Sequence, residues 1–202
     1  RISRGVKQVE GDNLDHHGPN IVLECMPLPL VQRAKLFKEG IRVVIPSHRR
    51  IPPESLTPRA KTHNYLNMVV ANQEVQSIDP EAWAVLLDIN GNLCEGMGSN
   101  VFTVRGGEVF TPREKFVLPG VSRQTVIDLA KGEGIALHEA DLDLYDAYNA
   151  DEVFLTSTSL CLCPVTKVNG VDIGPKGQVW GPVTRRLADA YQRFVDFDFV
   201  DQ

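Results

Sequence analysis

Residues 59–71 read RAKTHNYLNMVVA, which brings Lys61 directly before an apolar stretch. An amine forms an imine with a carbonyl only when it is unprotonated, and burial beside apolar groups lowers the pKa of a lysine. Lys61 is therefore a candidate nucleophile toward an aldehyde, although an arbitrary lysine is more often a plain surface residue. Apolar positions at helical spacing predict a helix from residue 61 to residue 76. Tyr65 lies four residues after Lys61, which would place both on one face of that helix.

A second segment supplies an acid in a glycine-rich turn. Residues 95–102 read EGMGSNVF, with Glu95 after a short apolar stretch and before Gly96 and Gly98. A carboxylate at such a place can bond a pyridine nitrogen and keep it protonated, which strengthens the ring as an electron sink. The alternative for Glu95 is a solvated carboxylate in a turn.

Two further segments are suited to an anion. Residues 118–123 read LPGVSR, and Ser122 is predicted as the N-cap of a helix, where Val121 and Ser122 would offer free N–H groups and a hydroxyl to a phosphate. Residues 156–159 read TSTS at the end of a predicted strand, so that Thr158 and Ser159 could complete a phosphate site or face a substrate carboxylate. A plain helix cap and a Thr/Ser-rich turn are the alternatives.

The remaining patterns predict an α+β protein with a mostly antiparallel sheet and flanking helices. A Pro-rich segment, residues 51–58, is expected to be irregular. Asn90-Gly91 predicts a hairpin turn with positive φ at both positions, and Gly106-Gly107 is predicted to join two strands. The predicted strands are residues 21–25, 40–46, 82–89, 100–105, 108–111 and 151–156, and the predicted helices begin at Ser122 and at Gly181-Pro182.

Charge and composition restrict the function classes. The formal net charge is −5 with a pI of about 5.5 and no marked basic run, which argues against a nucleic-acid partner. No apolar run approaches the roughly 20 residues of a membrane span, and the first residues do not resemble a signal peptide. The four cysteines are too few and scattered for a disulfide scaffold and show no zinc-like spacing. These features favour a cytoplasmic protein with no metal site.

Taken together and in order, these segments resemble the class IV (fold type IV) pyridoxal-phosphate enzymes. This family includes branched-chain aminotransferases, D-amino-acid aminotransferases, (R)-amine transaminases and aminodeoxychorismate lyases. The resemblance runs from about residue 50 to residue 193 and depends on residues 61–66, 95–102, 118–123 and 181–184. The ordered set is specific, whereas each piece alone is weak.

The resemblance implies a role for each candidate residue. Lys61 corresponds to the Schiff-base lysine that also carries the proton between two carbons, and Glu95 corresponds to the partner of the pyridine nitrogen. Tyr65 matches the tyrosine near the cofactor's phenolic oxygen. Arg50 matches a recurrent arginine upstream of the lysine, with its role left open.

The same resemblance implies positions for the cofactor's phosphate and for the substrate. Val121 and Ser122 correspond to phosphate-binding positions at a helix start. Thr158 falls on a phosphate-binding threonine, and Ser159 falls on the neighbour whose backbone faces the substrate carboxylate. We therefore count both Thr158 and Ser159 as substrate-binding candidates.

The resemblance also implies an organisation into domains. We expect residues 1–30 to be the remnant of a small N-terminal lobe that is largely absent here. Residues 31–60 would be a strand and a Pro-rich interdomain linker, and residues 61–202 the large domain that binds pyridoxal 5'-phosphate. Members of the family assemble as homodimers, so a second subunit is expected.

The expected function is a pyridoxal-phosphate-dependent aminotransferase that moves an amino group between an amino acid and a 2-oxo acid. The sequence that follows Lys61 favours a branched-chain-like or broad specificity. Three alternatives stay open: an (R)-amine or D-amino-acid transaminase, a lyase similar to aminodeoxychorismate lyase, and a fragment that binds no cofactor.

Overall fold

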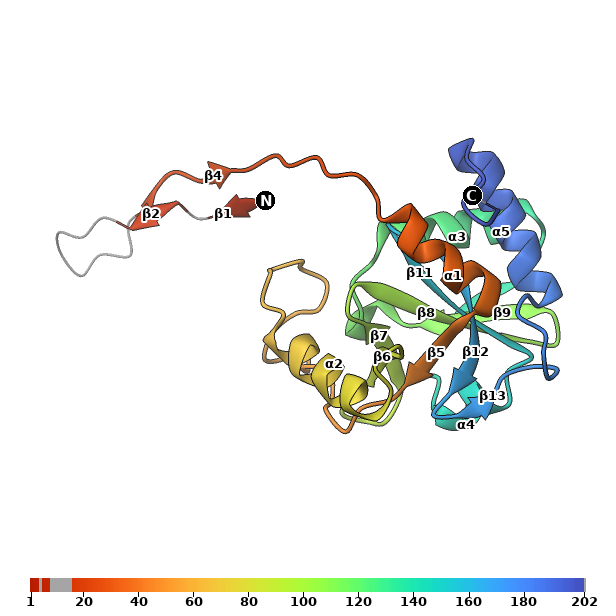
Figure 1. Cartoon of the computed structure of the whole chain (residues 1–202). Helices are drawn as coiled ribbons and strands as arrows, with labels where there is room; N and C mark the ends of the chain where they lie inside the picture. Colours follow the sequence, from red (N-terminus) through yellow and green to blue (C-terminus); the bar gives the residue numbers. More distant parts are fainter. Residues whose placement is uncertain (4, 8–15, 202) are drawn as a thin grey trace.

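A nine-stranded mixed sheet organises the chain (Figure 1). The computed structural model describes residues 1–3, 5–7 and 16–201. Because β7 pairs with β8 as well as with β6, the strands β8, β11, β12, β5, β6 and β7 close into a ring, while β9 and β10 extend it from β8. The strands are β5 (Ile41–Val44), β6 (Trp83–Leu87), β7 (Leu93–Gly96), β8 (Ser99–Arg105), β9 (Glu108–Pro112), β10 (Leu137–Ala140), β11 (Glu152–Ser157), β12 (Cys161–Val168) and β13 (Val171–Asp172).

Helices cover this sheet on two sides. The helices are α1 (Leu30–Glu39), α2 (Leu66–Ile78), α3 (Val121–Gly132), α4 (Leu144–Tyr148) and α5 (Pro182–Val195), with a 3-10 turn at Glu114–Phe116. Helices α1, α3 and α5 contact β11 or β12, and α2 packs on β6. The main core includes side chains of the sheet and of α1, α3 and α5, and within it the rings of Phe102 on β8 and Phe154 on β11 stack with centroids 4.8 Å apart. A smaller core lies under α2.

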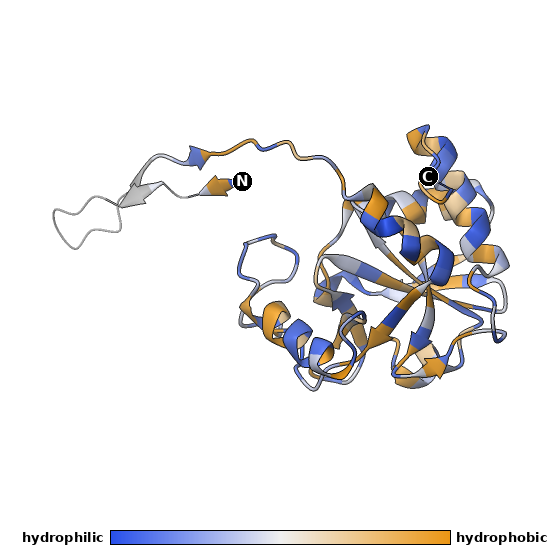
Figure 2. Cartoon of the chain, in the orientation of Figure 1, coloured by the Kyte–Doolittle hydropathy of each residue, from blue (hydrophilic) through white to orange (hydrophobic). Residues whose placement is uncertain are grey.

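The N-terminal residues form two short ladders away from this body (Figure 1). Strand β1 (Ile2–Ser3) pairs with β4 (Asn20–Ile21), and β2 (Val6–Lys7) pairs with β3 (His16–His17). The segment that leads from β4 to α1 carries exposed apolar side chains, among them Leu23 and Met26, which are 92% and 74% exposed (Figure 2). Burial is the ordinary fate of such side chains, so this segment is unusual for a folded protein.

The fold class is that expected from the sequence, an α+β protein in which antiparallel pairs outnumber parallel ones. The Gly106-Gly107 turn between β8 and β9 is confirmed, with φ of 59° and 82°. The Pro-rich segment is irregular, as predicted. Helix α5 begins at Pro182, directly after Gly181, also as predicted. Two helices, α1 and α4, were not predicted.

Several predicted boundaries are wrong. The helix predicted from residue 61 begins only at Leu66, because His63 has a left-handed φ of 61° that no helix accommodates. Lys61 and Tyr65 therefore do not share a helix face. The strand predicted over residues 21–25 ends at Ile21. In the Asn90-Gly91 turn only Gly91 has a positive φ, 92°.

The predicted N-cap of α3 is also wrong. Helix α3 begins at Val121, its N-cap is Gly120 in an extended conformation (φ −68°, ψ 144°), and Ser122 lies inside the first turn. No side chain of the described chain caps this terminus. The N–H groups of the first turn have no acceptor within a helix, so they are available to bind an acceptor from outside the helix.

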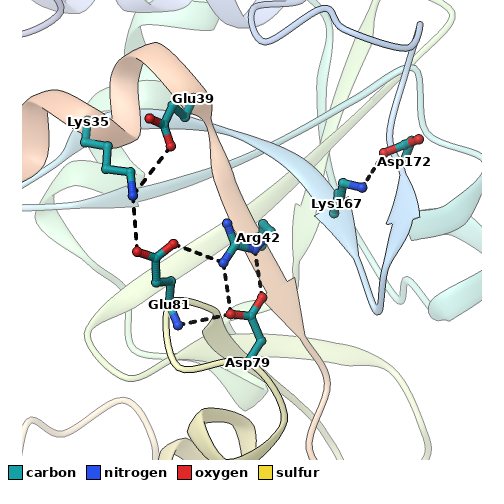
Figure 3. A network of polar contacts seen from close by, with 7 residues as sticks. All are labelled: Lys35, Glu39, Arg42, Asp79, Glu81, Lys167 and Asp172. Atoms are coloured by element: carbon teal, nitrogen blue, oxygen red, sulfur yellow. Dashed lines mark hydrogen bonds and ion pairs between the residues drawn. The ribbon is translucent and has the colours of Figure 1, made fainter.

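A network of ion pairs joins α1, β5 and the connection between α2 and β6 (Figure 3). Arg42 on β5 donates to both carboxylate oxygens of Asp79, at 2.7 and 2.9 Å, and to Glu81 at 3.2 Å. Glu81 also accepts from Lys35 of α1 at 3.1 Å. The bidentate pair has the geometry that makes a guanidinium–carboxylate contact strong. The network therefore fixes β5, which precedes the Pro-rich segment, against α1 and β6.

Within the described part of the chain, every helix falls short of the length and apolar character needed to cross a membrane. All four cysteines are free, and Cys94 and Cys163 are buried.

Candidate active site

A cavity of about 270 Å³ opens where four segments meet. It is bounded by the loop of residues 56–65, the β7–β8 turn, the loop that leads into α3, and the end of β11. Six of the seven candidate residues line it: Lys61, Tyr65, Glu95, Val121, Ser122 and Thr158. Ser159 does not, and its hydroxyl lies 3.5 Å from that of Ser157, which does. The fold thus brings together residues spread over about a hundred positions of sequence.

Glu95 is the buried acid of this cavity. It lies on β7 and is 4% exposed. Arg50 donates through Nε to Oε1 of Glu95 at 2.9 Å, and the backbone N–H of Leu118 donates to Oε2 at 2.9 Å. Burial raises the pKa of the Glu95 carboxyl, while Leu118, Arg50 and the charge of Lys61 act to lower it. The surroundings therefore supply three groups that favour the ionised form against the cost of burial.

Lys61 and Tyr65 reach the cavity from an irregular loop. The left-handed turn at His63 lies between them, and helix α2 begins just after Tyr65. The ring of His63 meets that of Tyr65 edge to face, with centroids 6.0 Å apart. Lys61 is exposed, in contrast to the burial expected from its apolar neighbourhood, because the apolar residues that follow it belong to the helix rather than to its own surroundings.

The start of α3 forms another part of the cavity wall. Gly120, Val121 and Ser122 line the cavity, Val121 is 82% exposed, and Ser122 is buried. Free N–H groups and the positive end of the helix dipole favour an anion at this place. The helix has 12 residues, so its dipole is well developed.

Two buried hydroxyls of the cavity have no hydrogen-bond partner within the described residues. They belong to Ser99 and Thr156, which are 5% and 1% exposed. A buried hydroxyl without a partner costs free energy. Because both residues line the cavity, a polar group bound there is a candidate partner for these hydroxyls.

A larger hollow, of about 450 Å³, lies elsewhere, at the start of α5. Its buried acid, Glu152, accepts from the N–H groups of Val183 and Thr184 at 3.0 and 2.7 Å. The carboxylate thus caps the helix. No lysine or histidine lines this hollow among the described residues, so the chemistry of an amine beside a buried acid belongs to the smaller cavity.

Comparison with known proteins agrees with this geometry. The sequence model of the family described as Amino-transferase class IV matches residues 3–168.

The chain belongs to the class IV aminotransferase family.

Known relatives extend beyond the matched part. The branched-chain-amino-acid aminotransferase of Escherichia coli K12 is 33% identical over 192 residues, which cover 94% of this chain and 60% of that protein. A branched-chain aminotransferase of Thermobaculum terrenum, solved in its PLP form, superposes with a TM-score of 0.73 at 32% identity and covers 82% of this chain and 55% of that one. A branched-chain aminotransferase of Thermoproteus uzoniensis, solved with norvaline, gives a TM-score of 0.72 at 32% identity, over 81% of this chain and 53% of that one. The chain therefore spans little more than half the length of these proteins, and its fold is that of fold type IV.

Sequence reasoning missed three parts of the site. The role of Arg50 was left open, and the contacts of Leu118 and Asn100 were not foreseen. Each of these contacts joins residues 18 to 45 positions apart, and no local pattern signals them.

Proposed function

We propose that the protein that carries this chain is a pyridoxal-phosphate-dependent aminotransferase that moves an amino group between an amino acid and a 2-oxo acid. The observation that carries the proposal is one cavity that holds a lysine, a buried carboxylate with an arginine partner, and an uncapped helix start. The names of the Escherichia coli relative and of the solved structures support branched-chain amino acids as substrates.

The residues present fit pyridoxal 5'-phosphate. The uncapped start of α3 suits a phosphate, and the unpartnered hydroxyl of Thr156 lies buried in the same cavity. Val121, Ser122 and Thr158 would hold the phosphate through N–H groups and hydroxyls. When bound, the cofactor supplies a conjugated ring that accepts the electron pair released at the substrate's α-carbon.

Glu95 would accept a hydrogen bond from the protonated ring nitrogen. Its Oε1 is bonded to Arg50 and its Oε2 to Leu118, and each carboxylate oxygen has a further lone pair for the ring. Burial raises the pKa of this carboxyl, and the Arg50 guanidinium opposes the rise, so it favours the ionised form. Arg50 and Leu118 thus fix the position of the Glu95 carboxylate, which would be the acceptor for the ring nitrogen.

Lys61 would supply the amine that reacts with the cofactor's aldehyde and would carry a proton on Nζ to and from the substrate's α-carbon. Tyr65, across the turn at His63, would donate its hydroxyl to the cofactor's phenolic oxygen. Thr158 and Ser159 would face the substrate carboxylate. The family resemblance assigns this part to the backbone of Ser159, which follows Thr158 directly but does not line the cavity in this structure.

We further propose that residues 1–30 belong to a smaller lobe, that residues 31–60 form the strand and linker region, and that residues 61–202 form the larger, cofactor-binding domain. The ladders β1–β4 and β2–β3, which are separate from the main sheet, support the boundary at residue 30. A homodimer is supported by exposed apolar side chains around the cavity, among them Leu66, Met97 and Val121. The free cysteines support a cytoplasmic location.

A donor screen on the full-length protein tests the proposal. The protein, loaded with pyridoxal phosphate, is given 2-oxoglutarate with L-leucine, L-valine, D-alanine or an (R)-amine, and glutamate is quantified. We expect glutamate with the branched-chain L-amino acids. Ketone product that forms without any acceptor would indicate a lyase, and absence of turnover with every donor would contradict the proposal.

A further inference from the structure

Asn100 lies where three parts of the candidate site meet. On β8 it pairs with Glu95 of β7 on one side and with Thr156 of β11 on the other. It is 6% exposed and lines the cavity, yet none of the roles proposed above uses it. A buried amide of this kind is kept in place by specific hydrogen bonds.

The Asn100 side chain is hydrogen-bonded to Leu118 in the loop before α3, and Leu118 is hydrogen-bonded to Glu95. Its Nδ2 donates to the carbonyl oxygen of Leu118 at 3.0 Å. The N–H of the same Leu118 donates to Oε2 of Glu95 at 2.9 Å. Both backbone polar groups of Leu118 are therefore engaged, one by Asn100 and the other by Glu95.

The same amide also packs against the start of α3. A Cβ added to Gly120, the N-cap of this helix, would lie 2.4 Å from Oδ1 of Asn100. The backbone of Gly120, at φ −68° and ψ 144°, is one that any residue adopts. A side chain at this position would therefore meet the Asn100 amide, which shows that the amide lies close against the start of α3.

We propose that Asn100 is a positioning residue that fixes the distance between the Glu95 carboxylate and the N-terminus of α3. The inference rests on the proposed function, in which the ring nitrogen and the phosphate of one rigid cofactor bind at these two places. A ligand held at both ends is sensitive to their spacing, whereas the same ring without phosphate is not. Asn100 therefore affects how much the phosphate group adds to the affinity for pyridoxal phosphate.

The test is the ratio of two dissociation constants, measured by absorbance titration of the full-length apoprotein with pyridoxal and with pyridoxal phosphate. Asn100→Ala adds no charge and removes both contacts. We expect the advantage of pyridoxal phosphate over pyridoxal to fall at least tenfold. Gly120→Ala, which pushes the amide aside, should reproduce this effect, and adding Gly120→Ala to Asn100→Ala should change little because the space is then empty.

Thr111→Val is the matched control. The Thr111 hydroxyl is fully buried and donates to the carbonyl of Val101, on the same sheet, at 2.9 Å. Thr111 does not line the cavity. This variant should keep the ratio of the unmodified protein, and thermal unfolding verifies that all variants fold. If Asn100→Ala and Gly120→Ala also keep the ratio, the inference is overturned while the proposed function stands. If the unmodified protein binds neither ligand, both are overturned.

Discussion

The Nε of Arg50 donates to Oε1 of Glu95 at 2.9 Å, and both side chains are nearly enclosed, with 12% and 6% of their surface exposed. Burial favours a neutral carboxyl, and the guanidinium opposes this. The ionised form of Glu95, which would accept a hydrogen bond from a protonated ring nitrogen, is thus favoured by Arg50 together with the N–H of Leu118. This gives the arginine before the Pro-rich segment a function that the sequence left open.

Replacing Arg50 by methionine should leave Glu95 buried without its counter-ion. The pKa of Glu95 should rise further, and the free energy of unfolding should fall by about 3 kcal/mol, as measured by urea titration at neutral pH. The double variant Arg50→Met/Glu95→Gln should regain most of this loss because it removes the uncompensated charge. Additive losses would show that the pair is not coupled.

Thr156→Val should stabilise the protein without cofactor and weaken cofactor binding. The Thr156 hydroxyl is buried without a partner among the described residues, so its removal should raise the free energy of unfolding by about 1 kcal/mol. The same change should raise the dissociation constant of pyridoxal phosphate about fivefold, the equivalent of one lost hydrogen bond. Thr111→Val, whose hydroxyl is bonded, should instead destabilise. Destabilisation by both variants would mean that the Thr156 hydroxyl is already satisfied.

The ion-pair network predicts a pH dependence of stability. Hydrogen bonds from Arg42 lower the pKa of Asp79 from its ordinary 3.8 to about 2. Because the folded protein holds this proton more weakly than the unfolded chain, the contribution is complete above about pH 4 and is lost as the pH falls toward 2. The difference in unfolding midpoint between the natural protein and Asp79→Asn should therefore shrink between pH 4 and pH 2.5. A difference that is equal at pH 7 and pH 2.5 would rule out this assignment.

Local signals in the sequence were enough for elements whose ends are set by their own residues. Gly181-Pro182 begins α5, and Gly106-Gly107 turns β8 into β9, because proline and glycine fix the backbone by themselves. The apolar spacing after Lys61 indicated a helix correctly from Leu66 onward. It could not reveal the left-handed His63, because a residue of this type adopts that conformation only in a particular context.

In the candidate site, too, some residues could be predicted from the sequence and others could not. Lys61, Glu95 and Ser122 could be named because each residue type suits one chemical task. The grouping of Arg50, Leu118 and Asn100 around Glu95 depends on the pairing of β7 with β8 and on the path of the loop before α3. Such contacts arise from the closed ring of strands, and the pattern of a single strand or loop does not encode them.

The proposed function depends on Lys61 as the amine that reacts with the cofactor. The most direct measurement is the absorbance spectrum of the full-length protein with pyridoxal phosphate before and after borohydride, followed by mapping of the labelled peptide. We expect a band that borohydride removes, a label on the peptide with Lys61, and no label in Lys61→Ala. A label on another lysine, or a reducible band that persists in Lys61→Ala, would contradict it.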